Sequence, residues 1–321
     1  MKIVFHGRNA QAFLPGFAEM VGPGHDIVAV SDATGSAAEV DAFETADVLI
    51  GIALGATHPR PAALKLYHAP AAGVDAIDRS LLPAGTPLCC CFGHEHAIAE
   101  YVLAALLLRH VPIPSADRDL REGRWTYWAG GGGQTRSELG GRTIGLLGYG
   151  HIGREVAKRA KAFGMRVTVA NRSPVAADGV VDQAFGLDRL AAFMGSADYI
   201  VTSLPALPET LGLVDAGALA AMRPDGVIVN VGRGPVIDEA ALFAALTERR
   251  IGGAIIDTWY VYPTPGTPAA RPGHLPFHDL DNCILTPHMS GWTDGTIRRR
   301  QETMAENIRR LATGAPLINR L

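Results

Sequence analysis

The chain has 321 residues, of which 48% are hydrophobic and 19% are charged, and its formal net charge is −3. A single hydrophobic core seldom organises more than about 250–300 residues, so this length predicts two domains. The balanced charge excludes the strongly basic surface that is typical of nucleic-acid-binding proteins.

Five short apolar runs precede residue 95, and Gly, Pro and Asp residues separate them. They lie at residues 2–7, 26–31, 46–52, 64–69 and 87–92. Their alternation with helical stretches predicts a parallel β-sheet with crossover helices. In the first run His6 comes too soon to leave room for the apolar region of a signal peptide, so we expect a cytoplasmic protein.

The fifth run contains three consecutive cysteines, Cys89, Cys90 and Cys91, whereas Cys283 stands alone. An apolar run of strand length favours buried, unreactive thiols over a disulfide framework. Neighbouring residues of a strand point to opposite faces, so we expect no metal site among these thiols.

A long helix is predicted from about His96 to about His110, and Pro112 and Pro114 end it. Its apolar stretch at 97–108 contains a glutamate and falls short of the roughly 18–20 residues that cross a bilayer, so we expect no membrane span. 

Residues 121–141 follow this helix, and their sequence predicts an irregular connection or arm. Trp125, Tyr127 and Trp128 lie just before four glycines at 130–133. These aromatic residues fit a pocket or a dimer arm, and core packing is the alternative.

A second series of strands and helices begins near residue 142. Six strands are predicted within residues 142–150, 166–173, 197–205, 226–234, 253–260 and 282–288. Six strands suffice for a dinucleotide-binding sheet. A last helix is predicted at about 294–311, and the whole pattern predicts an α/β protein with two doubly wound, Rossmann-like sheets in tandem.

The glycines Gly148, Gly150 and Gly153 form a G-x-G-x-x-G pattern between an apolar strand and an amphipathic helix. The first glycine permits a tight turn, the second lets the backbone approach a pyrophosphate, and the third lets helix and strand pack closely. Because strand, glycines, helix and next strand occur in this order, the pattern favours dinucleotide binding over a turn without a ligand.

The residues after the next strand bear on the choice of cofactor. NAD sites usually have an acidic residue there for the ribose 2′-hydroxyl, whereas this chain has Asn171, Arg172 and Ser173. A guanidinium and a hydroxyl can bind a 2′-phosphate, so we expect NADP(H), with NAD(H) less favoured. The alternative is that Arg172 is a solvated loop residue and NAD is used.

The chain resembles the D-2-hydroxyacid dehydrogenase family, and in type it is most similar to NADPH-dependent glyoxylate/hydroxypyruvate reductases. The motifs that carry the resemblance are AAGVDAID (71–78), AIAEYVLAALLL (97–108), ELGGRTIGLLGYGHIG (138–153), VNVGRGPVIDEAAL (229–242), GAIIDTW (253–259) and TPH (286–288). The family implies a substrate domain of residues 1–96 and 289–321, a nucleotide-binding domain of residues 97–288, a substrate cleft between them, and a homodimer formed through the nucleotide-binding domain.

The resemblance also implies which residues meet the ligands. Backbone N–H groups of Ala71, Ala72 and Gly73 would hold the substrate carboxylate, although a plain turn is the alternative. Asp257 would contact the cofactor near its nicotinamide, and its alternative is a strand-end turn former. The remaining implied cofactor contacts are Tyr149, His151, Ile152, Leu204, Pro205, Thr210, Val231 and Gly232.

Two residues match the catalytic positions of the family. Arg233 follows a strand end and would bind the carboxylate and carbonyl oxygen of a 2-oxo acid. The alternative is that Arg233 forms an ion pair with Asp238 or Glu239. His288 would supply the proton that turns the alkoxide into an alcohol, because histidine titrates near neutral pH. A lone histidine after a strand would otherwise be structural.

The third catalytic position departs from the family pattern. The family has a glutamate five residues after the Asp of GAIIDTW, and this chain has Tyr262. A carboxylate beside His288 would raise its pKa, whereas a phenol orients the ring without adding charge. We expect Tyr262 to orient His288, and the alternative is an aromatic residue that only lines the cleft.

These residues favour an NADPH-dependent reductase of glyoxylate, hydroxypyruvate or a similar small 2-oxo acid. Tyr262 motivates a second possibility, an oxidase similar to formate or phosphite dehydrogenase, because the formate dehydrogenase branch also lacks the glutamate. A third is an NAD(P)H-sensing corepressor, because C-terminal-binding proteins share the fold.

Overall fold

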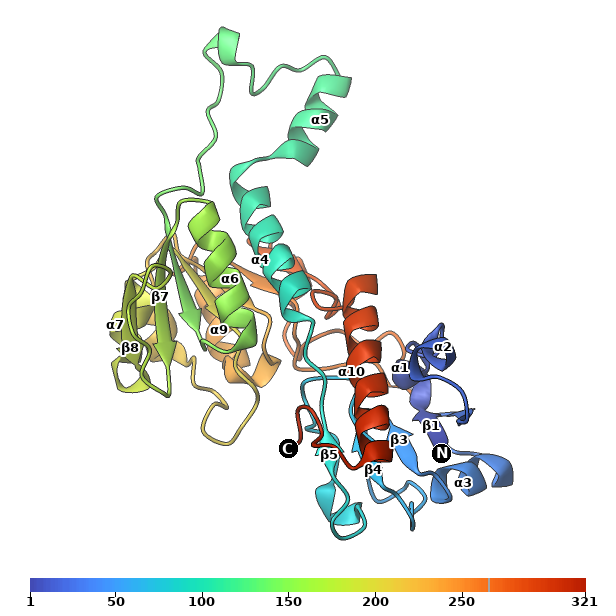
Figure 1. Cartoon of the computed structure of the whole chain (residues 1–321). Helices are drawn as coiled ribbons and strands as arrows, with labels where there is room; N and C mark the ends of the chain where they lie inside the picture. The colour runs from blue at the N-terminus through green and yellow to red at the C-terminus, as the bar shows by residue number, and fades with distance from the viewer. Residues whose placement is uncertain (265) are drawn as a thin grey trace. The chain divides into compact units, whose positions relative to one another are not determined.

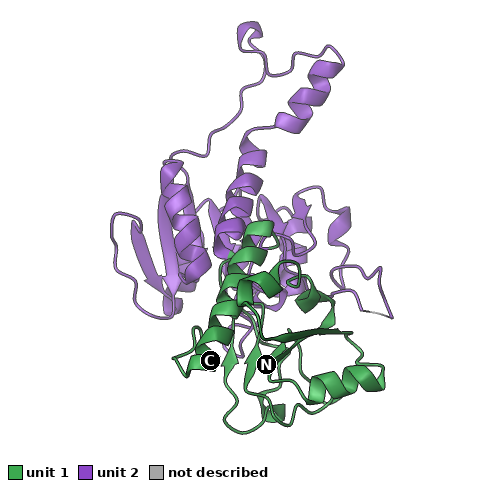
Figure 2. Ribbon diagram, turned by 45° about the vertical axis from the view of Figure 1, so that its right-hand side comes forward, with its two compact units in different colours: residues 1–94, 292–321 green, residues 95–291 purple. Residues whose placement is uncertain are grey.

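The computed structural model describes residues 1–264 and 266–321 of the chain. The chain forms two compact units, each built on its own parallel β-sheet (Figure 2). Unit 1 contains residues 1–94 and 292–321, and unit 2 contains residues 95–291. The two sheets with their helices confirm the predicted fold class, an α/β protein with two Rossmann-like sheets.

Unit 1 contains the five strands that the first apolar runs predict. They are β1 (Lys2–His6), β2 (Asp26–Val30), β3 (Val48–Ile50), β4 (Leu66–His68) and β5 (Leu88–Cys89), in the order β2-β1-β3-β4-β5 (Figure 1). Every neighbouring pair is parallel. The order reverses between β1 and β3, which is where open α/β sheets bind ligands.

Helices cover both faces of this sheet. Apolar side chains of β1 point alternately to the two faces, so each face needs a layer of helices to bury it. Ile3 and Phe5 point to a core that includes residues of α2 (Phe17–Val21) and α10 (Asp294–Thr313). Val4 points to the opposite core, which contains Phe43 of α3 (Ala37–Glu44). Helix α10 confirms the last predicted helix, and the hydroxyl of Thr293 caps it by accepting the Thr296 N–H.

The three consecutive cysteines have the predicted burial. Cys89, Cys90 and Cys91 are buried in unit 1, and Cys283 is half-buried in unit 2. Burial raises the pKa of the Cys89 thiol and of the Cys283 thiol to about 11, which keeps both protonated and unreactive near neutral pH. Among the described residues, no three His, Cys, Asp or Glu side chains gather as metal ligands.

The described residues of unit 2 form a sheet of seven strands. They are β6 (Thr143–Leu147), β7 (Arg166–Asn171), β8 (Gln183–Gly186), β9 (Tyr199–Thr202), β10 (Val227–Asn230), β11 (Gly253–Ile256) and β12 (Cys283–Leu285), in the order β12-β11-β10-β9-β6-β7-β8. The six predicted strands are confirmed. The additional strand β8 lies at the sheet edge and buries only Phe185, so no apolar run marks it in the sequence.

Two layers of helices cover the sheet of unit 2. One core joins α4 (Glu95–His110) and α6 (His151–Ala162) to the sheet. The other core contains residues of α7 (Leu190–Gly195), α8 (Ala216–Ala220) and α9 (Glu239–Thr247). The central strands β6, β9, β10 and β11 are therefore buried on both faces, as their apolar sequences require.

The segment after α4 differs from the prediction at its start. A further helix, α5 (Ile113–Arg121), begins directly after Pro112, where the sequence suggested only an end of helix. Pro114 occupies the first turn of α5, where the missing N–H costs nothing. The irregular arm that follows projects away from the sheet of unit 2 (Figure 1).

No single helix among the described residues is both long and apolar enough to cross a membrane. Helices α4 and α5 meet the length and composition criteria only when taken together, and they are bent by 48° at their junction. Helix α4 buries residues such as Val102 and Leu106 in the core of unit 2.

Candidate active site

Three predicted site residues follow neighbouring strands of unit 2. Arg233 comes after β10, Asp257 directly follows β11, and His288 comes three residues after β12. These strands are adjacent and parallel in the sheet. Their carboxyl ends therefore meet at one edge, which is where open α/β sheets bind their ligands.

Tyr262 and His288 are hydrogen-bonded to each other. The Tyr262 Oη lies 2.8 Å from the His288 Nδ1. The same oxygen accepts the backbone N–H of Trp259 at 3.1 Å, and it can donate its own proton to Nδ1 of a neutral ring that lacks a proton there. When the ring is protonated, the Nδ1–H donates to the phenol instead. In both states Nε2 is the ring nitrogen left to face a substrate.

The electrostatic surroundings of His288 push its pKa in opposite directions. Burial of the ring lowers the pKa, the negative charge of Asp257 raises it, and the positive charge of Arg233 lowers it. The net effect is a pKa below the usual value for histidine. Burial is also the main reason that the pKa of Tyr262 is raised, so the phenol stays neutral while His288 titrates.

Asp257 holds the loop that carries His288. The carboxylate is fully buried and accepts hydrogen bonds from the Thr286 hydroxyl at 2.6 Å, the Met289 N–H at 2.9 Å and the Ser290 N–H at 3.0 Å. His288 lies between these donors with φ of +57°, a left-handed conformation that is uncommon outside glycine. These contacts suit a strand-end turn former, and the implied contact of Asp257 with the cofactor stays a prediction.

A tyrosine from α4 extends this network. The Tyr101 Oη and the Thr286 Oγ1 are 2.7 Å apart, and because Thr286 donates its proton to Asp257, Tyr101 donates to Thr286. Neither residue had a predicted role. Thr286 belongs to the TPH motif, so the sequence placed it near the catalytic histidine. Nothing in the sequence indicates that Tyr101 contacts this loop.

Arg233 is half-buried and lies in a closely packed loop. Its Nη1 donates to the Gly232 carbonyl at 2.9 Å. A Cβ on Gly232 would lie 2.6 Å from the Leu204 carbonyl oxygen, and one on Gly234 would lie 2.3 Å from the Trp259 carbonyl oxygen. Glycine on both sides of Arg233 is therefore required by the neighbouring loops.

The two acidic residues after Arg233 have other hydrogen-bond partners. The Asp238 carboxylate caps α9 by accepting the Ala241 N–H, and the Glu239 carboxylate is 2.7 Å from the His274 ring. 

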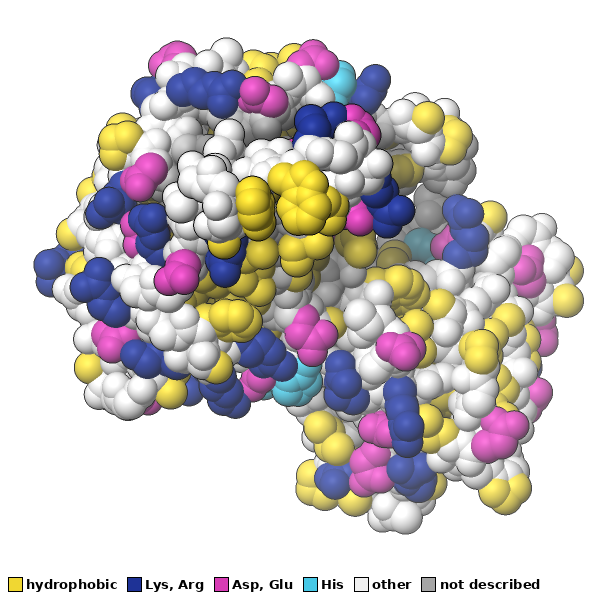
Figure 3. Space-filling model, turned by 90° about the horizontal axis from the view of Figure 1, so that it is seen from above, with side chains coloured by type: hydrophobic (Ala, Val, Ile, Leu, Met, Phe, Trp, Pro, Cys, Tyr) yellow, Lys and Arg dark blue, Asp and Glu magenta, His cyan; other side chains and the backbone are white. Residues whose placement is uncertain are grey.

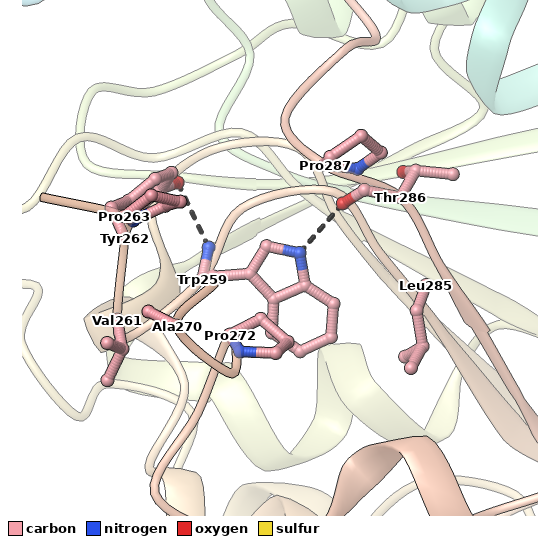
Figure 4. A pocket seen from close by; sticks show the side chains of 9 residues that line it. All are labelled: Trp259, Val261, Tyr262, Pro263, Ala270, Pro272, Leu285, Thr286 and Pro287. Carbon is pink, nitrogen blue, oxygen red and sulfur yellow. Dashed lines mark hydrogen bonds between the residues drawn. The ribbon is translucent and has the colours of Figure 1, made fainter. Parts of the chain in front are cut away.

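An apolar cavity of about 340 Å³ adjoins Tyr262 (Figure 4). Its lining includes Trp259, Val261, Tyr262, Pro263, Leu285 and Pro287. The indole N–H of Trp259 donates to the Thr286 carbonyl at 2.7 Å and so joins the two loops that form the cavity. Tyr262 thus lines a cavity with its ring and meets His288 with its hydroxyl.

The glycine loop after β6 has the shape that a pyrophosphate requires. A Cβ on Gly148 would lie 2.9 Å from the Leu204 Cδ2. A Cβ on Gly153 would lie 2.4 Å from the Gly148 carbonyl oxygen. A Cβ on Gly150 would meet no atom within 4 Å, and Gly150 is exposed at the N-terminus of α6. The residues present therefore fit a dinucleotide whose pyrophosphate lies against Gly150. 

The turn after β7 is joined to the glycine loop. The Asn171 Oδ1 accepts the Tyr149 N–H at 3.2 Å, and its Nδ2 donates to the Ser173 carbonyl at 3.0 Å. Arg172 forms an exposed ion pair with Glu209, with 3.4 Å between Nη1 and Oε1. Glu209 was not predicted, because it lies in a separate loop after β9.

The other predicted cofactor contacts follow strand ends of the same sheet. His151 and Ile152 begin α6, Leu204, Pro205 and Thr210 lie in the loop after β9, and Val231 and Gly232 follow β10. Thr210 is buried, and its Oγ1 donates to the Pro205 carbonyl at 2.6 Å and accepts the Leu207 N–H at 2.8 Å. Thr210 therefore fixes the shape of the loop that carries Glu209.

The predicted substrate loop lies in unit 1, after β4. Ala71, Ala72 and Gly73 are half-buried. The Ala71 carbonyl accepts the Cys91 N–H at 3.0 Å, and the preceding Pro70 carbonyl accepts Arg300 Nη1 at 3.0 Å. These contacts fix the backbone of the loop within its unit.

Comparisons with known proteins agree with this geometry. Residues 103–290 match the family model of the D-isomer specific 2-hydroxyacid dehydrogenase, NAD binding domain. The D-3-phosphoglycerate dehydrogenase of Mycobacterium bovis is 34% identical over 259 residues, which are 78% of this chain and 46% of that protein. The chain thus spans about half the length of this curated relative.

Solved structures match the whole chain. A D-isomer specific 2-hydroxyacid dehydrogenase family protein from Aeromonas salmonicida has a TM-score of 0.82 at 26% identity, covering 100% of this chain and 98% of that one. The NADPH-dependent glyoxylate/hydroxypyruvate reductase of Sinorhizobium meliloti has a TM-score of 0.75 at 25% identity, covering 100% and 96%.

Proposed function

The chain belongs to the family of D-isomer specific 2-hydroxyacid dehydrogenases, and on this basis we propose that it is an NADPH-dependent reductase of a small 2-oxo acid. The product is the D-2-hydroxy acid. Glyoxylate and hydroxypyruvate are the substrates that we favour, because the reductase from Sinorhizobium meliloti is named for them.

The contact between Tyr262 and His288 carries this proposal. It fixes the ring with Nε2 available for a substrate, and Arg233 lies close enough to influence the pKa of both residues. A proton donor and a guanidinium at one sheet edge suit a substrate that has a carbonyl beside a carboxylate.

The reduction needs one hydride and one proton. When bound, NADPH supplies the hydride that adds to the carbonyl carbon of the substrate. Arg233 stabilises the negative charge that develops on the carbonyl oxygen, and the protonated His288 donates a proton from Nε2 to that oxygen. His288 is left neutral with its remaining proton on Nδ1, which donates to the Tyr262 hydroxyl oxygen, and Nε2 regains a proton from solvent.

The carboxylate of the substrate needs its own binding groups. We assign this role to Arg233, and the family resemblance implies a part in it for the backbone of Ala71, Ala72 and Gly73. The hydrogen bonds that fix this loop to Cys91 and Arg300 support the assignment, because a rigid backbone presents its N–H groups without a further loss of entropy.

For the cofactor we assign the pyrophosphate to the Gly148–Gly153 loop and the 2′-phosphate of NADPH to Arg172 and Ser173. No protein atom lies within 4 Å of a Cβ placed on Gly150, which leaves room for the pyrophosphate. The strand end has Asn171 where NAD sites usually have an acidic residue, so no carboxylate repels the 2′-phosphate there. The exposed guanidinium of Arg172 is the charge that would favour NADPH over NADH.

The arm of unit 2 supports a homodimer. Ile113, Leu120, Trp125 and Trp128 are all more than half exposed, at 52–65%. Apolar side chains also gather on the face seen in Figure 3. Exposed apolar patches of this kind usually mark protein interfaces, and we propose that the arm binds a second copy of the chain. A cytoplasmic location stays a prediction.

The experiment that tests this function is a spectrophotometric panel with the purified chain. It measures NADPH and NADH oxidation with glyoxylate, hydroxypyruvate and larger 2-oxo acids, and the reverse reaction with D-3-phosphoglycerate. We expect oxidation of NADPH with the small 2-oxo acids. The absence of oxidation with every 2-oxo acid would refute the proposal.

A further inference from the structure

We infer that Glu209 sets the preference between NADPH and NADH by competing with the 2′-phosphate for Arg172. This inference rests on the proposed function and concerns the affinity of the same site. It begins from the ion pair between Arg172 and Glu209, in which Nη1 and Oε1 are 3.4 Å apart.

The position of the pair places it beside the glycine loop. Arg172 follows β7 and Glu209 follows β9, and these strands flank β6 on either side. The glycine loop follows β6 and leads into α6. The ion pair therefore joins the two loops that border the proposed pyrophosphate site, at the carboxyl edge of the sheet.

Both partners stand on a fixed backbone. The side chain of Asn171 ties the turn at Arg172 to Tyr149 and Ser173. The buried Thr210 hydroxyl holds the loop that presents Glu209 through Pro205 and Leu207. Glu209 therefore keeps its charge near Arg172.

The charges determine the sign of the effect. A 2′-phosphate that binds Arg172 must share the guanidinium with Glu209 or displace the carboxylate, and the two anions repel each other. NADH has a neutral 2′-hydroxyl and does not meet this repulsion. Glu209 should therefore weaken NADPH binding more than NADH binding. The preference for NADPH over NADH should be smaller with Glu209 present than it would be with Arg172 alone.

The size of the effect follows from exposure. The side chains of Arg172 and Glu209 are 79% and 56% exposed, and ion pairs with such exposure are screened by water and salt. Replacing the carboxylate by a neutral amide should therefore strengthen NADPH binding by about two- to fivefold at low ionic strength.

The test is calorimetric titration of the wild-type chain, Glu209→Gln, Arg172→Gln and the variant with both substitutions. The ligands are NADPH, NADH and 2′,5′-ADP, which carries the phosphate without the nicotinamide. Glu209→Gln should bind NADPH and 2′,5′-ADP more tightly and NADH nearly as before, and the gain should shrink as salt is added. Glu248→Gln is the matched control, because Glu248 pairs with Arg250 just before β11 begins, at the opposite edge of the sheet.

An NADPH affinity that is unchanged or lower in Glu209→Gln would overturn the inference. An equal gain when Glu209→Gln is added to Arg172→Gln would also overturn it, because Glu209 would then not act through Arg172. Tighter binding of NADH than NADPH by the wild type would instead refute the proposed cofactor. In that case the NADPH affinity of Glu209→Gln relative to the wild type still tests the role of Glu209, because only a higher affinity supports it.

Discussion

The hydroxyl of Tyr262 lies 2.8 Å from Nδ1 of His288 and also accepts the N–H of Trp259. A phenol in this place can accept a hydrogen bond from a protonated histidine and donate one to a neutral histidine. It therefore orients the ring in both protonation states without adding the negative charge that a carboxylate would bring.

The first prediction concerns the pH dependence of reduction. Burial and the charge of Arg233 lower the pKa of His288, and reduction needs the protonated ring, so kcat/KM should fall as pH rises through a pKa below about 6.5. Tyr262→Glu places an anion beside the ring and should move this decline to higher pH. Tyr262→Phe should lower the rate mildly and leave the position of the decline unchanged.

The measurement is kcat/KM for a 2-oxo acid against pH in the three proteins. A profile that does not move in Tyr262→Glu would show that residue 262 does not control the protonation of His288 during the reaction.

The second prediction concerns Asp257. Asp257→Asn puts an amide NH₂ in place of one of the two oxygens that accept these three hydrogen bonds, so at least one donor loses its acceptor. We expect a loss of about 1–3 kcal/mol in the free energy of unfolding. The loss of the negative charge should also lower the pKa of His288 further and move the decline in rate to lower pH.

Urea unfolding and the pH profile measure these two effects separately. Asp238→Asn is a control, because Asp238 caps α9 with an exposed side chain. If Asp257→Asn is no less stable than this control, Asp257 does not hold the His288 loop.

The third prediction separates two glycines of the phosphate loop. A Cβ at Gly150 meets no protein atom within 4 Å, so Gly150→Ala should fold normally and yet lose about tenfold or more in NADPH affinity through a clash with the pyrophosphate. A Cβ at Gly153 would lie 2.4 Å from a backbone oxygen, so Gly153→Ala should lower the melting temperature.

Melting temperatures without cofactor and NADPH dissociation constants test this contrast. Unchanged NADPH affinity in Gly150→Ala would place the pyrophosphate elsewhere.

The fourth prediction concerns the arm. Trp125→Ser combined with Trp128→Ser removes two exposed indoles that lie 6.0 Å apart and should convert a dimer into monomers without unfolding the sheets. Analytical ultracentrifugation gives the mass in solution, and circular dichroism is the control for folding. A wild-type chain that sediments as a monomer would contradict the proposed homodimer.

Much of the fold could be predicted because its signals are local. Apolar runs marked the strands, and a glycine pattern between a strand and a helix marked the phosphate loop. Strand β8 was missed because an edge strand with one buried residue has no apolar run. Helix α5 was missed because Pro112 and Pro114 were interpreted as ending a helix, whereas Pro114 lies in the first turn of a new one.

The site was predictable only where a motif fixed the spacing. Counting five residues from Asp257 led to Tyr262, whose contact with His288 is present in the structure. Tyr101 and Glu209 escaped notice because each meets its partner across long stretches of sequence, and no spacing rule reports such a contact. The hydrogen bonds of Asp257 to the His288 loop were likewise visible only once β11 and β12 were paired.

The most direct test of the proposed mechanism compares wild type and His288→Ala in the reduction of glyoxylate by NADPH, with NADPH affinity measured in parallel. The loss of the proton donor should lower kcat by about 10²–10⁴-fold and leave the dissociation constant for NADPH nearly unchanged. Equal kcat values in the two proteins would contradict the account, because His288 would then have no part in the proton transfer.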